Sequence, residues 1–441
     1  MGCKVSVIMP SFNVAPYIDE CMDSVLNQTL QDIEIIVVDA DSTDGTQDIL
    51  QEYADHDSRV KILRDDRKST GYANNIAIDL AQGEYVGIVE TDDYITPDMY
   101  EVLYGIAKQE KCDVVKGDYW SFSGSGDDRL FIKRKLWMDL KDKYGKVIDP
   151  RKEKYIFDAI MFNWAGIFRR DFLNEYKIRH QETPGASFQD NGFYFQTMAF
   201  AQRVYFENKS FYRYRRDNPN SSINKSDKVF CMCDEYDFIE GILKEYPELW
   251  DAYYYGYMRR RYGACSWTLK KVLPEYKHQL ARRMHEDLVR LLRSEDDLKF
   301  IQREQRYYNE MRLLYDDVDQ YVSEMVNEQN QYEDDAQELC DRIRGDVLIF
   351  GCGECGTGMD SLLMGHGVVA RAYIDNDKGL QGTTFNRKPV LSLSEAMALY
   401  PNAVILSTIQ KEWDTIRNQL VKSGVSDEMI IDIDIKKYIW D

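Results

Sequence analysis

Short apolar runs alternate with helical patterns through the first 95 residues, and this alternation constrains the fold more than any other feature of the chain. The apolar runs are residues 5–10, 34–39, 60–63 and the stretch that leads to Asp92 and Asp93. Between the first two runs, apolar residues from Ile18 to Val25 recur at the spacing of one helix face. Strands that alternate with helices predict a mostly parallel sheet with helices on both faces, which is an α/β fold.

Several side chains follow these runs at the edge where a parallel sheet binds its ligands. Phe12 follows the first run, Asp39 ends the second, and Asp92 and Asp93 end the fourth. Because ligands lie outside the carboxyl ends of parallel strands, we expect these side chains to converge on one cleft. Two adjacent carboxylates suit Mg²⁺ or Mn²⁺, which takes one or two protein carboxylates and completes its shell with water and substrate phosphates. The alternative is an ordinary acidic turn before a helix that begins near Pro97.

Three motifs in this region resemble the nucleotide-binding half of family 2 glycosyltransferases. They are VSVIMPSFN from residue 5, EIIVVDADSTDGT from residue 34 and GEYVGIVETDDY from residue 83. The resemblance covers about residues 4–225 and implies the A-type fold, with an inverting enzyme whose donor is a nucleotide-diphosphate sugar, expected to be a UDP-sugar. The chain departs from the family pattern at residues 40–41, at residues 73–75 and at Glu90, where Asp-Gly, Ala-Arg-Asn and Asp are usual.

The resemblance also implies roles for individual residues. By it, Pro10 and Phe12 border the nucleotide base, and Asp39 forms a hydrogen bond to that base. Asp92 contacts the ribose or the metal ion, and Asp93 ligates the metal ion. A divalent cation held there would neutralise the charge that builds on the leaving diphosphate.

Asp190 lies in a glycine-flanked loop at the position from which the family supplies the catalytic base. The family commonly has Glu-Asp there, and this chain has Gln189-Asp190. By the resemblance, Asp190 takes the proton of an acceptor hydroxyl while that hydroxyl attacks in line and inverts the anomeric carbon. The alternative role for this aspartate is a helix N-cap, which the residue type also suits.

A basic loop follows at residues 212–222 and contains Arg213, Arg215 and Arg216. Arginine forks fit phosphate oxygens, and the family often carries a basic segment there that closes over the diphosphate. The residues leave open which of the three binds, and Arg215 is taken as the candidate. The alternative is the edge of a surface strand with solvated arginines.

The composition restricts the environment and the partners of the chain. A net charge of −20 argues against a nucleic-acid partner, because phosphate backbones need a positive surface. The sequence has no run of about 18 apolar residues that could span a membrane. The strand at residue 5 leaves no room for a secretory signal, and nine scattered cysteines are typical of reduced thiols. We therefore expect a cytoplasmic protein.

Residues 229–344 show helical patterns with two further features. Between residues 259 and 283 there are eight Lys or Arg and one acid, which suits either a helix on an anionic membrane surface or a solvated basic face. Apolar residues from Met311 to Leu339 repeat every seventh position, and a second set from Tyr315 to Ile343 follows four residues later. This heptad predicts one long helix in a coiled coil, used either for a homo-oligomer through residues 311–343 or for packing on helices of the same chain.

A second strand and helix pattern begins at residue 345. A strand is followed by G-x-G-x-x-G at Gly351, Gly353 and Gly356, then by a helix and a strand that ends at Asp375, nineteen residues beyond the last glycine. This order and spacing are typical of a dinucleotide-binding motif. The first half of this region also resembles a small nucleotide-sugar-binding domain that precedes some bacterial sugar acyltransferases. Ligand sensing, acceptor placement or subunit packing is favoured over redox catalysis, and the alternative is a purely structural α/β cap.

Together these observations predict three domains: an A-type glycosyltransferase domain over residues 1–228, a helical segment over 229–344 and a small Rossmann-like domain over 345–441. The predicted function is metal-dependent transfer of a sugar from a nucleotide-diphosphate donor to a glycan or lipid-linked acceptor in bacterial surface polysaccharide synthesis. The protein would be cytoplasmic, with peripheral contact at the inner membrane face as a further expectation. The alternatives are a non-catalytic nucleotide-sugar-binding regulator and an NAD(P)-linked oxidoreductase that uses the last domain.

Overall fold

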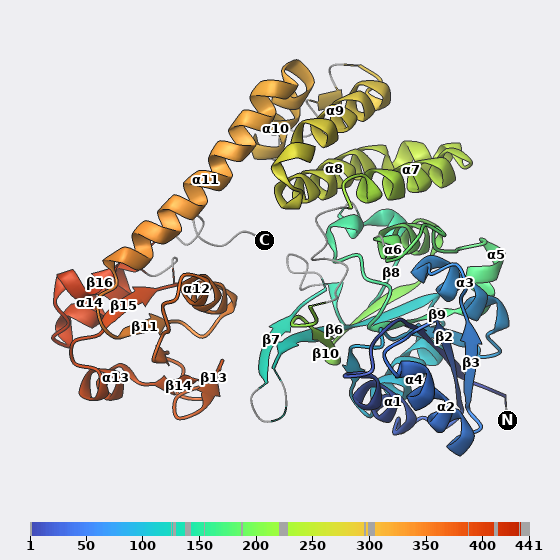
Figure 1. The fold of residues 1–441 in the computed structure, drawn as a ribbon, viewed down its shortest axis with the longest axis horizontal. Helices are drawn as coiled ribbons and strands as arrows, with labels where there is room; N and C mark the ends of the chain where they lie inside the picture. The colour runs from blue at the N-terminus through green and yellow to red at the C-terminus, as the bar shows by residue number, and fades with distance from the viewer. Residues whose placement is uncertain are drawn as a thin grey trace. The chain divides into compact units, whose positions relative to one another are not determined.

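Figure 1 shows the computed structural model of the 441-residue chain. The structure describes residues 2–431 and 433, apart from 125, 127–128, 137–142, 154, 187, 220–227, 295–296, 299–304, 387, 410–412 and 432. Contacts divide the chain into two compact units, which are Met1–Ser121 with Lys133–Val322 and Phe122–Ile132 with Ser323–Asp441. The predicted domain boundaries at residues 228 and 344 stay a prediction.

The first unit is built on a large mixed sheet. Its parallel part has the order β3-β2-β1-β4 and consists of β1 (Val5–Ser11), β2 (Ile33–Asp39), β3 (Val60–Arg64) and β4 (Tyr85–Ile88). The strand path continues through β9 (Gly166–Arg169), β6 (Val114–Ser123), β10 (Val204–Arg215) and β5 (Tyr94–Ile95). β7 (Leu130–Arg134) pairs with β6, and β8 (Val147–Ile148) pairs with β10. β9 runs antiparallel to β4, so the sheet changes direction next to the strand that precedes the acids. The predicted mostly parallel α/β fold is confirmed.

Helices connect these strands as the apolar spacing predicts. They are α1 (Ile18–Leu26), α2 (Thr46–His56), α3 (Thr70–Leu80), α4 (Met99–Glu110), α5 (Arg170–Glu175) and α6 (Gln189–Phe200), with short 3₁₀ turns at Pro150–Lys152 and Ile156–Asp158. The apolar face predicted for α1 is confirmed, because Ile18, Cys21, Met22 and Val25 are all fully buried. The helix expected near Pro97 begins at Met99.

The first unit also contains a layer of helices. These are α7 (Cys231–Lys244), α8 (Pro247–Lys271), α9 (Pro274–Leu291), α10 (Gln305–Asp316) and the start of α11 (Val318–Arg342), which Figure 1 shows in green to orange. α8 and α9 each begin at a proline, which suits the first turn because that turn needs no amide donor there. In the described part of the chain, no helix is long and apolar enough to cross a bilayer.

The expectation of one long coiled-coil helix over residues 311–343 is wrong in one respect. The helix is interrupted at Asp317, between α10 and α11. The heptad residues are also buried within this chain: Met311 lies among helices of the first unit, and Leu339 belongs to a hydrophobic core of the second. The alternative, in which the seam packs on the same chain, accounts for these positions.

The second unit holds a smaller sheet with the order β13-β14-β12-β11-β15-β16. The strands are β11 (Val347–Phe350), β12 (Ala372–Ile374), β13 (Thr384–Phe385), β14 (Lys388–Leu391), β15 (Val404–Ser407) and β16 (Ile430–Ile431), and all except β13 are parallel to their neighbours. The helices are α12 (Glu354–Gly365), α13 (Leu393–Leu399) and α14 (Trp413–Lys422), and a 3₁₀ turn spans Asp427–Met429. The sheet reverses its order between β11 and β15, which is where doubly wound sheets bind ligands.

Two apolar cores lie on the two faces of β11. Val347 and Ile349 join one core with residues of α11 and α12, and Leu348 and Phe350 join the other with residues of α13 and α14. Because successive side chains of a strand point to opposite faces, this division shows that β11 is buried on both sides.

Candidate active site

The acidic turn after β4 is fastened on two sides by strands that are distant in sequence. The Thr91 hydroxyl donates to the Pro10 carbonyl oxygen at 2.9 Å, which ties the turn to the end of β1. The Glu90 amide donates to the Tyr212 hydroxyl at 3.0 Å, which ties it to β10. The turn closes on itself, since the Asp93 amide donates to the Glu90 carbonyl oxygen at 3.1 Å. The acids are therefore held at the carboxyl edge of the sheet, as predicted.

The two adjacent aspartates have different environments. Asp93 is 1% exposed, its Oδ1 accepts the Arg215 amide at 2.7 Å, and its Oδ2 is buried with no hydrogen-bond partner among the described residues. Asp92 is partly exposed, and its Oδ2 accepts from the Asn218 side chain at 2.8 Å. Burial raises the pKa of both carboxyls, and for Asp93 the neighbouring Asp92 charge raises it further. Asp92 is thus the more accessible of the two aspartates, and Asp93 faces the interior.

The arginines of the basic loop also separate into different roles. Arg215 is 7% exposed, and its guanidinium donates to the Asp92 carbonyl oxygen at 2.9 Å and to Glu20 at 3.1 Å. Arg213 donates to main-chain oxygens of its own strand. Arg216 is exposed, and its guanidinium lies 5.6 Å from the centre of the Tyr214 ring. Arg215 therefore supports the acidic turn directly, and Arg216 reaches the surface.

Asp190 is the second residue of α6 and does not cap that helix. The helix begins at Gln189, and the cap position is Phe188, whose backbone is left-handed with φ of 66°. Asp190 Oδ1 accepts the Asn191 amide at 3.0 Å within the first turn. Burial raises the pKa of the Asp190 carboxyl to about 6, although these amide donors and the charge of Lys116 oppose the shift. A carboxylate with this pKa is suited to accept protons near neutral pH.

The charge of Asp190 acts on the acidic turn. The pKa of Glu90 is raised to about 8, first by burial and then by the charges of Asp92 and Asp190. The Asp190 carboxyl therefore lies within electrostatic range of Glu90. Among the described residues, no lysine or arginine forms an ion pair with any of the three. No basic side chain in direct contact therefore offsets the negative charge of Asp92 or of Asp190.

Lys116 is a buried base at this site that the sequence reasoning missed. It is fully buried in β6, and its Nζ donates to the carbonyl oxygens of Phe162 at 2.8 Å and Trp164 at 2.6 Å. Burial lowers its pKa to about 7, and the charge of Asp190 partly opposes that shift. The signal that could have found it is a lysine directly after the apolar pair Val114 and Val115.

The acids fit a divalent cation when the donor supplies the remaining ligands. No group of three or more His, Cys, Asp or Glu in the described residues could hold a metal ion on its own. Mg²⁺ and Mn²⁺ need only one or two protein carboxylates when substrate phosphates complete the shell. Asp92 offers such a carboxylate.

The other predicted nucleotide contacts lie at the same edge of the sheet. Phe12 is 50% exposed beyond β1, and Pro10 is buried within that strand. Asp39 is 1% exposed, and its carboxylate accepts from Ser42 at 2.5 Å and 3.0 Å and from the Gln47 side chain at 2.9 Å. The Asp39 carboxylate therefore braces the turn before α2, and Phe12 is the most accessible of these three side chains.

Aromatic rings form a stack that leads away from the acidic turn. Trp164 stacks on Tyr212 with ring centres 4.4 Å apart, on Tyr214 at 5.1 Å and on Phe162 at 4.1 Å. Tyr212 and Trp164 are buried, and Phe162 and Tyr214 are partly exposed. The stack thus begins at Tyr212, whose hydroxyl accepts the Glu90 amide, and ends in the two partly exposed rings.

The glycine motif of the second unit comes together with Asp375. Gly351 has a left-handed φ of 113°, and a Cβ at Gly356 would lie 2.1 Å from the Gly351 carbonyl oxygen. Asp375 Oδ2 accepts the Cys352 amide at 3.0 Å. These contacts explain why two of the three glycines are needed there.

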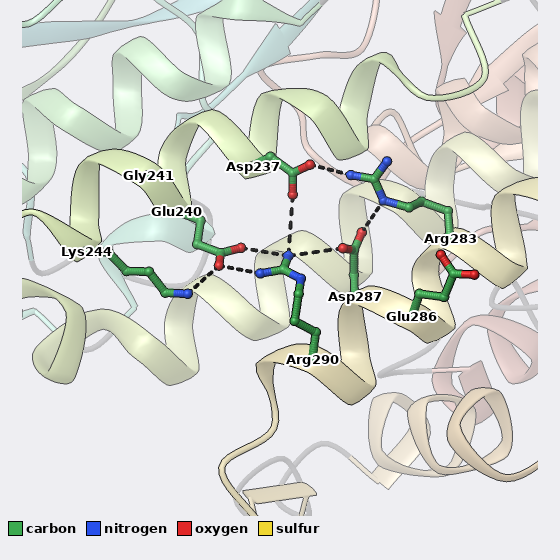
Figure 2. Close-up of a pocket in the computed structure, with 8 residues that line it drawn as sticks. All are labelled: Asp237, Glu240, Gly241, Lys244, Arg283, Glu286, Asp287 and Arg290. Carbon is green, nitrogen blue, oxygen red and sulfur yellow. Dashed lines mark hydrogen bonds and ion pairs between the residues drawn. The ribbon is translucent and has the colours of Figure 1, made fainter.

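A charged cavity of about 570 Å³ lies elsewhere in the first unit, between α7 and α9 (Figure 2). Its lining residues are Asp237, Glu240, Gly241, Lys244, Arg283, Glu286, Asp287 and Arg290. Arg290 pairs with Glu240 at 2.5 Å and with Asp287 at 3.1 Å, and buried Arg261 also pairs with Asp287. None of the lining residues is one of the acids at the sheet edge. Three arginines of the basic stretch of residues 259–283 thus form ion pairs within the chain: Arg259 with Asp158, and Arg261 and Arg283 with Asp287.

Comparisons with known proteins agree with the fold of the first part of the chain. The family model for glycosyl transferase family 2 matches residues 6–206. The chain is 31% identical to the uncharacterized glycosyltransferase EpsJ of Bacillus subtilis (strain 168) over 217 residues, which is 49% of this chain and 62% of EpsJ. It is 30% identical to the glycosyltransferase GlyG of Streptococcus pneumoniae serotype 4 (strain ATCC BAA-334 / TIGR4) over 220 residues, which is 49% of this chain and 72% of GlyG.

A likeness to a solved structure covers more of the chain. The chain is 18% identical to the crystal structure of S. aureus TarS 1–349 in complex with UDP-GlcNAc, with a TM-score of 0.45. The match covers 72% of this chain and 92% of the TarS chain. The chain spans less than two thirds of EpsJ and somewhat more than two thirds of GlyG. The family match includes every predicted residue of the first unit's site except Arg215. The chain belongs to glycosyl transferase family 2.

Proposed function

We propose that the chain transfers a sugar from a nucleotide-diphosphate donor, expected to be a UDP-sugar, to a hydroxyl of a glycan or lipid-linked acceptor, with inversion at the anomeric carbon. The observation that carries this proposal is the meeting of Asp190, whose pKa is raised to about 6, with the acidic turn at the carboxyl edge of the sheet. Bacterial surface polysaccharide synthesis is the proposed setting, and EpsJ and GlyG are glycosyltransferases of bacteria.

Asp92 and Arg216 are proposed to bind the diphosphate side of the donor. Asp92 is the aspartate with an accessible carboxylate, so it is the better candidate to hold Mg²⁺ or Mn²⁺. Such an ion, when bound, supplies charge neutralisation at the leaving phosphate. Asp93 and Arg215 hold the turn in place, because both are buried and bonded to each other's segments. Exposed Arg216 is available to the phosphate oxygens.

Asp190 is proposed to act on the acceptor side as general base. The acceptor oxygen forms its bond to the anomeric carbon, the bond from that carbon to the diphosphate breaks, and the acceptor proton moves to the Asp190 carboxylate. The partly exposed rings of Phe162 and Tyr214 offer apolar faces beside this position, which suits the apolar face of a sugar ring. Phe12 is proposed to border the nucleotide base, with Pro10 and Asp39 shaping the strand ends beneath it.

The glycine motif of the second unit is proposed to bind a nucleotide. Gly351, Gly353 and Gly356 with Asp375 form the loop, and the close packing of Gly356 on Gly351 supports it. Neither membrane contact nor oligomerisation forms part of the proposal. Arg261 and Arg283 pair with acids of the same chain, and the heptad residues Met311 and Leu339 are buried in it.

The test is a panel of UDP-glucose, UDP-galactose, UDP-GlcNAc and GDP-mannose, each added with Mn²⁺ while thermal stability and nucleotide release are measured. We expect one donor to raise the unfolding temperature and to release its nucleotide only when the divalent ion is present. Stabilisation by a donor without nucleotide release, with every acceptor tried, would favour the regulator. Saturable NAD(P) binding with hydride transfer would favour the oxidoreductase.

A further inference from the structure

One buried acid, Glu235, accepts a hydrogen bond from the first turn of α6, the turn that carries Asp190. Glu235 lies outside the residues that the family model matches. The Gly192 amide donates a 2.8 Å hydrogen bond to Oε1 of Glu235. Glu235 is 1% exposed and lies on α7, beyond residue 206 where the family match ends. The first-turn amides of a helix lack partners within that helix, so a side chain that accepts one of them fixes the helix start.

Gly192 leaves no room for any other arrangement of this contact. A Cβ at Gly192 would lie 2.2 Å from Glu235 Oε1 and 3.1 Å from the Phe238 ring. The close approach of α7 therefore depends on the absence of a side chain at this position. Because Gly192 follows Asp190 by two residues in the same helical turn, a shift of one moves the other.

The other oxygen of Glu235 shows that the contact does not depend on an ion pair. Oε2 is buried and has no hydrogen-bond partner among the described residues. Burial raises the pKa of Glu235 well above its usual range, and the charge of Asp190 raises it further. A protonated carboxyl still accepts the Gly192 amide through its carbonyl oxygen, and the side-chain amide of glutamine has the same acceptor.

We propose that Glu235 is a positioning residue for transfer, which fixes the first turn of α6 from α7 and thereby sets the place of Asp190 against the acceptor hydroxyl. The inference rests on the proposed role of Asp190 as general base. The buried Glu235 side chain also fills the space beside Gly192, which its replacement by alanine would open. Displacement of a catalytic group by about 1 Å costs on the order of 10²-fold in rate, so a contact of this kind affects turnover more than binding.

Three variants separate positioning from simple support of the fold. Glu235→Ala removes the acceptor, Glu235→Gln keeps it without the acid, and Asp234→Asn removes a carboxylate from the adjacent residue of α7, which faces Arg283 instead. With the donor that wild type turns over, we expect Glu235→Ala to lower kcat by about 10- to 100-fold while the donor KM changes by no more than about twofold. Glu235→Gln should restore most of the turnover, and Asp234→Asn should behave as wild type.

The pH profile adds a readout that a purely structural role would not move. Loss of the Glu235 side chain admits water behind Asp190, so the acidic limb of kcat/KM in Glu235→Ala should move to lower pH, towards an ordinary aspartate. In Glu235→Gln the limb should stay in place. Wild-type turnover in Glu235→Ala, or a loss in Glu235→Gln as large as in Glu235→Ala, would overturn the inference.

Hydrogen exchange tests the contact without any substrate. In the full chain, Glu235→Ala should speed exchange in peptides that contain the Gly192 amide, and Glu235→Gln should not, while peptides from the second unit stay unchanged. If no donor of the panel is turned over but this exchange pattern holds, the proposed function fails and the contact stands. If wild type is active and Glu235→Ala changes neither exchange nor kcat, the positioning role fails and the proposed function stands.

Discussion

The main-chain amide of Arg215 donates a 2.7 Å hydrogen bond to Oδ1 of Asp93, across 122 residues of sequence. The same arginine donates from its side chain to the Asp92 carbonyl oxygen at 2.9 Å. The end of β10 therefore holds the acidic turn that follows β4. This contact turns Asp93 inward and leaves Asp92 as the aspartate that a ligand can reach.

Exchange of each aspartate for asparagine should separate these two roles. Asp92→Asn should remove the strengthening of UDP binding by Mn²⁺, because it replaces the accessible carboxylate. Asp93→Asn should keep that effect, because asparagine retains an oxygen for the Arg215 amide, whereas Asp93→Ala should destabilise the fold by about 1–3 kcal/mol. Calorimetric titration of UDP with and without Mn²⁺, together with urea unfolding, measures both. Equal loss of the Mn²⁺ effect in both asparagine variants would show that Asp93 is also a ligand.

Asp190→Asn should abolish transfer and leave the donor bound. A general base contributes roughly 10²–10⁴-fold, so kcat should fall by about that factor while the affinity for UDP with Mn²⁺ stays near that of wild type. Titration of UDP and measurement of sugar transfer decide the outcome. Transfer at close to the wild-type rate in this variant would rule out Asp190 as the base.

The activity should fall as the pH drops through about 6, because Asp190 must be ionised to accept a proton and its pKa is raised to about 6. Burial raises this pKa, so the acidic limb should lie above that of an exposed aspartate, whose pKa is about 3.9. The pH dependence of kcat/KM with saturating Mn²⁺ measures the limb. A limb near pH 4 would show that Asp190 is hydrated in the working enzyme.

Two neighbouring arginines should respond differently to removal. Arg216→Ala should raise the donor KM by about tenfold without changing the unfolding temperature, because an exposed charge-assisted contact is worth about 1.5–3 kcal/mol to binding. Arg215→Ala should lower stability, because it removes the donors to the Asp92 carbonyl oxygen and to Glu20. Steady-state kinetics and thermal unfolding of both variants give the comparison. A raised KM in Arg215→Ala with unchanged stability would return the phosphate contact to Arg215.

Leu339→Ala should destabilise the second unit rather than change an oligomeric state. Leu339 is 1% exposed in a core with residues of β11 and α12, and truncation of a buried leucine costs about 2–5 kcal/mol. The exposed neighbour Glu338 provides the matched control, since Glu338→Ala should have little effect. Urea unfolding and light scattering measure stability and mass. A change of mass in Leu339→Ala with unchanged stability would support the coiled-coil oligomer.

The strands and the convergence of the acids were predictable because they depend on local patterns. Apolar runs of strand length and the helical spacing from Ile18 to Val25 report burial directly, and parallel strands must place their carboxyl ends at one edge. The heptad from Met311 to Leu339 also indicated buried residues, but it did not indicate which segments those residues pack against. An apolar seam has the same spacing whether it faces another chain or cores of its own, so the interruption at Asp317 and the two separate packing surfaces could not be predicted.

The sequence by itself determined that an acidic pair follows β4, that a helix comes next to Asp190 and that a glycine motif follows β11, because each depends on neighbouring residues. Only the tertiary structure decided which aspartate faces outward, which arginine is buried and which acid holds α6. Those choices depend on β10, β6 and α7. The residues that these elements contribute lie between 26 and 145 positions after Glu90 in the sequence. Asp92 and Asp93 lie in a turn, and the end of β10 packed beside that turn determines which of the two faces the interior.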